Sequence, residues 1–370
     1  MISSALRIGH LQAAEPIIQG GMAVGVSLAR LAAAVANEGG IGVLAAAMIG
    51  MNEPDVSRNP SEANNRALRR ELRKARAATA GIIGVNIMMA LTLFAESVRT
   101  SIEEKADVIF SGAGLPMELP KYLLELCEQK KEEFKTRLVP IVSSARAAGL
   151  IAKKWLNRFD YLPDAFVVEG PKAGGHLGFS PEQINDPDYE LEKLVPCVIE
   201  AVKPFEDKKG RAVPVIAAGG IFTGLDILRY LKMGAAGVQM GTRFVVTEEC
   251  DVNERFKQAY VEAQPESPTI IKSPVGMPGR ALNNSFIQDI QDGKRKPIKC
   301  LFHCLHTCDP QAAPYCIAAA LINAMKGNLE RGFAFCGSNV GRITGITTVH
   351  ELFEMLKAEY AAALAAEIVS

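Results

Sequence analysis

The feature that most constrains the fold is a series of short apolar runs that end in small or polar residues and alternate with helical stretches. The runs are PIIQGGM, GIGVLAA, GIIGVNIM, DVIFSGAG, RLVPIVS, AFVVEG, VPVIAAGG and AGVQMG. They are continuously apolar, as expected of parallel strands buried on both faces. Eight strand–helix cycles over about 250 residues predict an α/β fold of the TIM (β/α)8 barrel type. An open doubly wound sheet is the alternative, but eight parallel runs favour closure.

Helix signals lie between these runs. After the first run, Ser27 is placed to cap the start of a helix and Gly39 to end it. Between the seventh and eighth runs, Thr223 and Asp226 have the spacing of a capping box, and Gly234 marks the stop. Both signals support helices between consecutive strands.

The pattern divides the chain into two parts. Residues 1–262 are predicted to form the barrel, which the C-terminal helix at 346–370 completes. Residues 263–345 do not fit another barrel turn and are predicted to form a small, mostly helical lid with a cysteine cluster. The polar stretch 50–66 and the segment 171–190 are expected to be loops on the barrel.

Charge and composition exclude several classes of protein. Lys plus Arg and Asp plus Glu both number 41, so no net charge favours nucleic acid or anionic lipid. The basic run 66–76 is expected to be the solvated face of a helix. No apolar stretch reaches the ~20 residues of a spanning helix, and the N-terminus does not resemble a secretory signal. The eight cysteines do not suggest a secreted disulfide framework. A cytoplasmic location is expected.

Two strand ends predict a phosphate site. The seventh run ends with Ala218, Gly219 and Gly220, and the eighth with Gly241 and Thr242. In a TIM barrel, phosphate groups bind after strands seven and eight, where glycines allow close approach of backbone N–H groups. The helix that opens after the seventh run would point its positive end at the same place. No GxGxxG dinucleotide fingerprint occurs at this position.

A glycine-rich loop after the sixth run carries the candidate catalytic residue. In FVVEGPKAGGHLG, the strand ends at Glu169, and His176 follows on the loop. Histidine is suited to proton transfer near neutral pH. His176 is predicted to be functional, because it lies at the catalytic rim; no role is assigned to Glu169 or Lys172. Four other histidines are expected on the surface or in packing: His10, His303, His306 and His350.

Polar or very small residues interrupt other strand ends. Gln19, Gly20, Gly21 and Met22 close the first run, and Asn86 falls within the third. Buried polar groups are costly without partners, so a hydrogen-bonding ring ligand would explain these residues. A tight loop would explain them equally well.

Four cysteines lie close together in the predicted lid. Cys300, Cys304 and Cys308 are spaced by four residues, which on a helix would form one stripe, and Cys316 follows. The spacing matches a zinc site only in part, and an iron–sulfur cluster is an alternative. Simple packing or redox-active thiols are the favoured interpretation, so no metal is assigned.

Several motifs together resemble the nitronate monooxygenase (2-nitropropane dioxygenase-like) family, which also includes FMN-dependent enoyl-acyl-carrier-protein reductases. The motifs are PIIQGGM, GVNIM, VVEGPKAGGHLG, VPVIAAGGI and VQMGTRF, and the resemblance covers about residues 8–356. It implies a TIM barrel with non-covalent FMN and places the active-site histidine at His176. The implied FMN contacts are Gly20, Gly21, Met22, Asn86, Gly174, Gly175, Ala218, Gly219, Gly220, Gly241 and Thr242.

The resemblance implies a flavin oxidoreductase but leaves its substrate open. The leading hypothesis is oxidation of alkyl nitronates with O₂, with His176 removing the proton beside the nitro group. The alternative is an NAD(P)H-dependent enoyl-thioester or quinone reductase, and a redox sensor built on the cysteine cluster is a third hypothesis. Gly337, Ser338 and Asn339 replace an Ala-Gly-Gln stretch of many family members. A small-molecule substrate is expected, without nucleic acid or membrane; a homodimer is left open.

Overall fold

The computed structural model describes residues 2, 5–294 and 298–369. Residues 1, 3, 4, 295–297 and 370, which include both ends of the predicted barrel, lie outside the described part. Within it, eight parallel strands close into a barrel in the order β10-β11-β3-β4-β5-β6-β7-β8. These strands are β3 Ile17–Gln19, β4 Ile41–Ala45, β5 Ile82–Met88, β6 Val108–Gly112, β7 Arg137–Val142, β8 Phe166–Glu169, β10 Val215–Ala218 and β11 Gly237–Met240. Each lies inside one of the apolar runs, so the predicted TIM barrel is confirmed.

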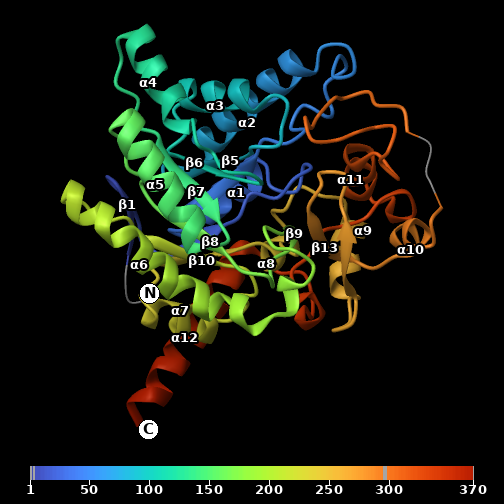
Figure 1. The fold of residues 1–370 in the computed structure, drawn as a ribbon. Coiled ribbons are helices and arrows are strands. Elements are labelled where there is room, and N and C mark those ends of the chain that lie inside the picture. The colour runs from blue at the N-terminus through green and yellow to red at the C-terminus, as the bar shows by residue number, and fades with distance from the viewer. Residues whose placement is uncertain (1, 3–4, 295–297, 370) are drawn as a thin grey trace.

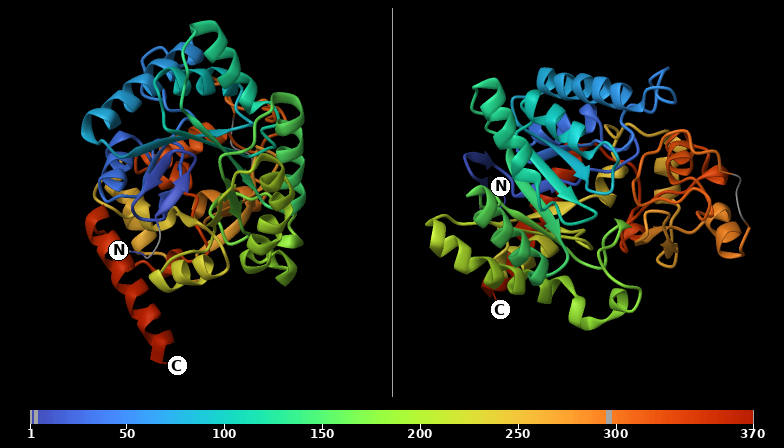
Figure 2. Two further views of the ribbon diagram at one scale, coloured as in Figure 1. Left: turned by 90° about the vertical axis from the view of Figure 1, so that its left-hand side faces the viewer. Right: turned by 45° about the horizontal axis from the view of Figure 1, so that its top comes forward.

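Helices surround the barrel (Figures 1 and 2). They are α1 Ala29–Asn37, α2 Pro60–Ala78, α3 Phe94–Glu103, α4 Leu119–Lys130, α5 Ala145–Phe159, α6 Leu191–Lys209, α7 Gly224–Lys232 and α12 Val349–Val369. The last of these, α12, packs against α7 and α1 and buries Leu352, Phe353 and Leu356. It therefore occupies the place of the helix that follows β11.

Two apolar layers hold this arrangement together. One lies between strands and helices and includes Leu31, Val85 and Val168. The other fills the barrel interior and includes Val167 and Ala218. At the N-terminal end of the barrel, the hairpin β1 Leu6–Ile8 and β2 Leu11–Ala13 adds its apolar side chains to the interior layer. The hairpin thus closes the barrel at the end opposite to the carboxyl ends of the strands.

The helix signals were partly right. Thr223 and Asp226 form the predicted capping box at the start of α7, and Gly234 follows its end with φ +96°. Gly39 likewise follows α1 with φ +85°. The predicted cap by Ser27 is wrong: α1 begins after Leu28, without a side-chain cap. The Ser27 Oγ instead accepts a hydrogen bond from the Met22 N–H at 2.8 Å. This contact joins two residues of the loop between β3 and α1.

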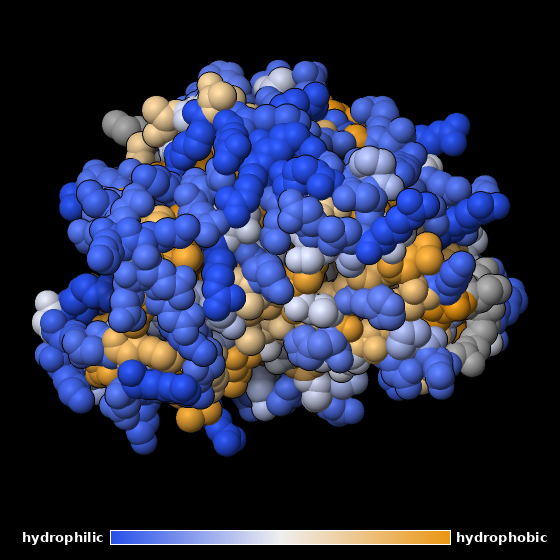
Figure 3. All heavy atoms as spheres, turned by 90° about the horizontal axis from the view of Figure 1, so that it is seen from above, coloured by the Kyte–Doolittle hydropathy of each residue, from blue (hydrophilic) through white to orange (hydrophobic). Residues whose placement is uncertain are grey.

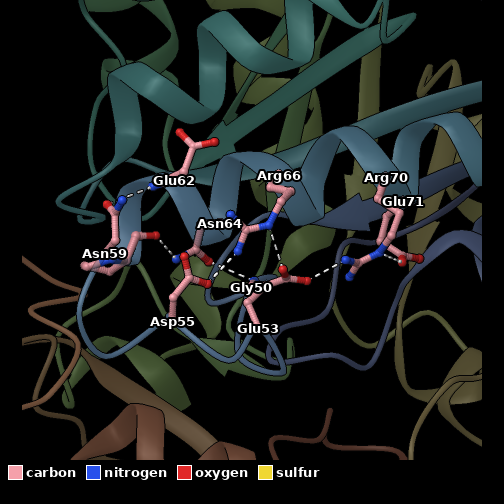
Figure 4. A network of polar contacts seen from close by, with 10 residues as sticks. Gly50, Glu53, Asp55, Asn59, Glu62, Asn64, Arg66, Arg70 and Glu71 are labelled. Atoms are coloured by element: carbon pink, nitrogen blue, oxygen red, sulfur yellow. Dashed lines mark hydrogen bonds and ion pairs between the residues drawn. The ribbon is translucent and has the colours of Figure 1, made fainter.

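The basic run lies on α2, as expected, and is compensated by acidic neighbours. Arg66 contacts Glu53 and Asp55, and the Arg70 side chain contacts Glu53 as well (Figure 4). Arg73 pairs with a glutamate of the neighbouring α3–β6 connection. The face that carries α2 to α4 is covered mainly by hydrophilic side chains (Figure 3). Exposed pairs of this kind stabilise little individually, and the run is a solvated helix face whose arginines are paired with carboxylates.

The segment 263–345 lies at the carboxyl ends of the strands, at the right of Figure 1. It is preceded by α8 Thr242–Val245 and α9 Glu254–Val261 and contains the hairpin β12 Pro268–Lys272 and β13 Pro278–Leu282, then α10 Ser285–Gln291 and α11 Ile317–Met325. Short 3₁₀ turns in this segment occur at Leu329–Arg331 and Val340–Arg342. Two others, Gln183–Asn185 and Pro187–Tyr189, lie on the barrel loop between β9 and α6. The hairpin was not part of the mostly helical lid expected here. Because β13 also pairs with β9, Gly175–His176, it connects this segment to the barrel loop.

Among the described helices, none is both long enough and apolar enough to cross a membrane.

Candidate functional site

A cavity of about 510 Å³ opens at the carboxyl ends of the barrel strands, beneath the segment 263–345. It is lined by every residue that the sequence predicted for catalysis or cofactor binding: His176, Gly20, Gly21, Met22, Asn86, Gly174, Gly175, Ala218, Gly219, Gly220, Gly241 and Thr242. The volume is in the range of small-molecule and cofactor sites. The fold therefore brings residues from five separate strand ends into one place.

The predicted phosphate loops leave four backbone donors without partners. Gly219 and Gly220 have φ of +98° and +83°, a conformation that favours glycine. Within the described residues, the backbone N–H groups of Gly219, Gly220, Gly241 and Thr242 form no hydrogen bond to the protein. All four residues are half-buried and line the same cavity, so N–H groups without protein partners at this place fit an anionic ligand.

The N-terminus of α7 contributes less to this cradle than the sequence suggested. The N–H groups of Phe222 and Thr223 donate to the Asp226 carboxylate, and the Gly224 N–H donates to Glu359. Carboxylates therefore occupy the N–H groups of the two residues before α7 and of its first residue, and the Asp226 N–H donates to the Thr223 Oγ1. An anion would depend on the strand-end glycines instead.

The residues that depart from the family pattern reinforce the same loops. The Gly337 N–H donates to the Thr242 Oγ1 at 2.9 Å, and the Asn339 side-chain amide donates to the Gly220 carbonyl at 2.6 Å. The Ser338 N–H donates to the Lys172 carbonyl at 3.1 Å. Residues 337–339 thus connect three cavity-lining loops, and Gly337 and Asn339 line the cavity themselves.

Three polar side chains mark the end of the barrel interior that faces the cavity. Asn86, Glu169 and Gln239 belong to β5, β8 and β11 and all line the cavity. None of their side chains forms a hydrogen bond to another residue in the described part of the chain. The Gln239 Oε1 atom is buried without any partner. Such groups are costly unless a ligand satisfies them, so this floor fits an uncharged ring with hydrogen-bonding edges.

His176 is held from the lid side of the cavity. It lies on β9, opposite Gly279 of β13, and its Nε2 is 2.8 Å from the Ser273 Oγ. Its ring meets the Phe335 ring edge to face at a centroid distance of 5.0 Å. Burial away from water lowers the pKa of His176 to about 4. The imidazole is therefore neutral near pH 7 and can accept a proton.

The cysteine stripe predicted from spacing does not form. Residues 298–316 contain no helix, so Cys300, Cys304 and Cys308 do not share a helical face. In the described part of the chain, no group of three or more Cys, His, Asp or Glu side chains is arranged to hold a metal ion. Cys304 lines the cavity, and burial raises the pKa of its thiol to about 12. The hypothesis of a redox sensor depended on a cluster of these cysteines, and the described residues do not form one that could hold a metal.

Some cavity residues were not found from the sequence. Gln239 could have been recognised, because it is a polar residue within an apolar run. Glu169 stands out for the same reason, but the sequence assigned it no role. Ser273 and Phe335 lie about 100 and 160 residues beyond His176 and had no local signal. Only the pairing of β9 with β13 brings Ser273 to the histidine.

The chain is similar to known proteins in sequence and in fold. The sequence model described as nitronate monooxygenase matches residues 7–359. A probable nitronate monooxygenase of Staphylococcus aureus is 27% identical over 302 residues, covering 74% of this chain and 77% of the relative. The structure of FabK from Thermotoga maritima has 29% sequence identity and a TM-score of 0.72, and the match covers 95% of this chain and 94% of that one.

A further relative acts on a coenzyme A thioester, according to its name. It is the (3aS,4S,5R,7aS)-5-hydroxy-7a-methyl-1-oxo-octahydro-1H-indene-4-carboxyl-CoA dehydrogenase of Mycobacterium tuberculosis, 31% identical over 281 residues, or 76% of this chain. The match spans 66% of that relative's length, slightly less than two thirds. The family match extends over nearly the whole chain. This chain is therefore a member of the nitronate monooxygenase family, a family of flavin-dependent oxidoreductases.

Proposed function

We propose that this chain is an FMN-dependent oxidoreductase of the nitronate monooxygenase type, which oxidises alkyl nitronates with O₂ and uses His176 as the active-site base. The observation that carries the proposal is the half-buried imidazole of His176, which is neutral near pH 7, in the same cavity as four backbone N–H groups without protein partners. A base and an anion cradle in one cavity fit a phosphate-bearing cofactor beside a proton-transfer group.

The residues present fit FMN. The N–H groups of Gly219, Gly220, Gly241 and Thr242 would hold the phosphate, because these residues line one cavity and the groups have no protein partners in the described part of the chain. Asn86 and Gln239 would satisfy the polar edge of the ring, and the small strand-end residues Gly20 and Gly21 would leave room for its face. When bound, FMN supplies the two-electron oxidation of the substrate carbon and the reaction with O₂.

His176 would remove the proton from the carbon beside a nitro group. Within the described residues, its Nε2 contacts Ser273, while Nδ1 has no hydrogen-bond partner. If Nε2–H donates to Ser273, Nδ1 is the free base. After proton transfer, the imidazolium would face the nitronate anion. No Lys or Arg lines the described cavity, so this histidine would supply the positive charge within it.

A second candidate function is reduction of an enoyl thioester or quinone with NAD(P)H. Its support is the similarity to FabK and to a CoA-thioester dehydrogenase, together with an apolar wall of Met88, Leu91, Ile317 and Leu321. An apolar wall would accept an acyl chain as readily as a nitroalkane. The apolar wall therefore does not distinguish an enoyl thioester or quinone from a nitroalkane.

An anaerobic reduction experiment separates the two candidates. The purified protein is mixed without O₂ with NADH, with NADPH or with a small alkyl nitronate, and the flavin absorbance near its visible maximum is followed. We expect bleaching with the nitronate and no change with either pyridine nucleotide. Bleaching by NADH or NADPH would contradict the monooxygenase proposal and support the reductase.

Ser273 provides a second test, because its role would be to position His176. In Ser273→Ala, turnover of a neutral nitroalkane should fall about fivefold to tenfold, in line with the loss of one hydrogen bond worth about 1 kcal/mol. Oxidation of preformed nitronate, which needs no base, should hardly change. The matched control is Ser267→Ala, since the Ser267 Oγ lies at the start of the same hairpin and accepts from the Gln264 N–H outside the cavity. Equal losses on both substrates would indicate a structural role instead.

A further inference from the structure

Two arginines lie beside the proposed phosphate site without carboxylate partners. Phe222 lines the cavity two residues after Gly220, and the guanidinium groups of Arg243 and Arg342 both lie against its ring. The guanidinium carbon of Arg243 is 4.8 Å from the ring centroid, and that of Arg342 is 4.5 Å from it. Within the described residues, neither arginine forms an ion pair. The proposed function gives these two charges no role.

Both arginines are joined to the proposed phosphate loops by short stretches of chain. Arg243 directly follows Thr242, whose backbone N–H is one of the four proposed phosphate donors. Consecutive Cα atoms are about 3.8 Å apart, so the Arg243 backbone lies next to that donor. Arg342 is three residues beyond Asn339, whose side-chain amide donates to the Gly220 carbonyl at 2.6 Å. The fold therefore brings one cation from the barrel and one from the segment 263–345 to the same loops.

Arg243 is held in place, whereas Arg342 is exposed. The Arg243 Nη1 donates to the Phe222 carbonyl at 3.0 Å. Burial lowers the pKa of the Arg243 guanidinium, Glu359 opposes this effect, and Arg342 adds to it. Glu359 itself accepts a hydrogen bond from the Gly224 N–H at 2.7 Å. Because two like charges against one ring repel each other, a nearby anion would stabilise the pair.

The cavity lining offers little positive charge to a phosphate group. In the described part of the chain, no Lys or Arg lines the cavity, and the His176 imidazole is neutral near pH 7. The proposed cradle consists of backbone N–H groups, which carry only partial charges. A phosphate monoester carries about −1.5 to −2 charges at pH 7. Full cations that compensate this charge must therefore lie outside the lining, where Arg243 and Arg342 are placed.

We propose that Arg342, together with Arg243, is a positioning residue that recognises the phosphate charge of the cofactor and so favours FMN over riboflavin. The inference rests on the proposed function, because it takes FMN as the ligand. The backbone N–H groups would make the direct contacts, and the two arginines would act through space. Charges interact over about 10 Å at 0.1 M salt, so the guanidinium groups need no contact with the phosphate.

A pair of substitutions removes the same charge at two places. Arg342→Gln removes it beside Phe222, and Arg331→Gln is the matched control. Arg331 is exposed, does not line the cavity and lies on the 3₁₀ turn beside α10 and α11, whereas the turn of Arg342 lies beside α9. The dissociation constants of FMN and riboflavin are measured for the full chain, freed of flavin, by quenching of flavin fluorescence. Circular dichroism confirms folding.

We expect Arg342→Gln to weaken FMN binding about threefold to fivefold at 0.1 M salt, the upper range for a solvent-accessible ion pair. Riboflavin binding should stay unchanged, because riboflavin has no phosphate. Arg331→Gln should change neither constant. Arg342→Lys keeps the charge and should bind FMN within about twofold of the wild type.

Ionic strength supplies a second readout. The difference in FMN affinity between wild type and Arg342→Gln should grow at about 10 mM salt, where the Debye length is about 30 Å. It should disappear near 1 M salt, where the Debye length is about 3 Å. A contribution from packing alone would not follow this dependence.

The outcomes are distinguishable from failure of the proposed function. A chain that binds neither FMN nor riboflavin would overturn the function itself. Equal weakening of FMN and riboflavin in Arg342→Gln, at every salt concentration, would reduce Arg342 to a packing partner of Phe222. FMN bound equally well by wild type and Arg342→Gln, or weakened as much by Arg331→Gln, would likewise overturn the placement of the charge and leave the function standing.

Discussion

Replacing His176 with alanine should lower the oxidation of neutral nitroalkanes by about 100-fold or more, the usual contribution of a general base. FMN should remain bound, because the proposed phosphate contacts are backbone groups that follow β10 and β11 rather than this imidazole. Oxidation of a preformed nitronate should fall much less, since that substrate has already lost its proton. The measurement is kcat/KM for the nitroalkane and for its nitronate in each variant.

The control for this substitution is His306→Ala. His306 lies in the same segment over the cavity, but its side chain is exposed and does not line the cavity. It should leave both activities unchanged. Because burial lowers the pKa of His176 to about 4, wild-type turnover should not decline through protonation of this residue until the pH approaches 4. Equal losses on nitroalkane and nitronate in His176→Ala would refute the base assignment.

The barrel could be predicted because its signal is local. Buried parallel strands require continuous apolar runs, and all eight runs contain a barrel strand in the described structure. Capping at Thr223 and Asp226 is also local, since it involves residues three apart. Ser27 shows the limit of such reasoning, because the same hydroxyl can cap a helix or fix the loop before it, and here it binds Met22.

The cavity was predictable in part for the same reason. In a TIM barrel, residues at the carboxyl ends of strands must meet, so the glycines after β10 and β11 could be placed together from their positions alone. Contacts with the segment 263–345 could not, because they depend on tertiary pairing. Ser273 reaches His176 only through the β9–β13 ladder. The cysteine spacing predicted a stripe only on condition of a helix, which residues 298–316 do not form.

Substitution of Gly219 by valine should abolish stable retention of FMN. Gly219 has φ +98°, where a β-branched residue is strained by about 1–3 kcal/mol. A Cβ there would lie 2.9 Å from the Gly170 carbonyl oxygen and 3.1 Å from Ala173, so the loops around the proposed phosphate site would have to separate. The loss of a close backbone N–H approach adds to this effect. The flavin-to-protein ratio of the purified variant measures it.

Strain alone could also lower flavin content by destabilising the protein, so a matched glycine is needed. Gly210 ends α6 with φ +60°, and a Cβ there meets no atom within 4 Å. It does not line the cavity, so Gly210→Val imposes backbone strain without touching the proposed site. We expect Gly210→Val to keep its full flavin content while its melting temperature falls. Unchanged flavin content in Gly219→Val would refute the phosphate placement, and equal flavin loss in both variants would attribute the effect to stability rather than to the cradle.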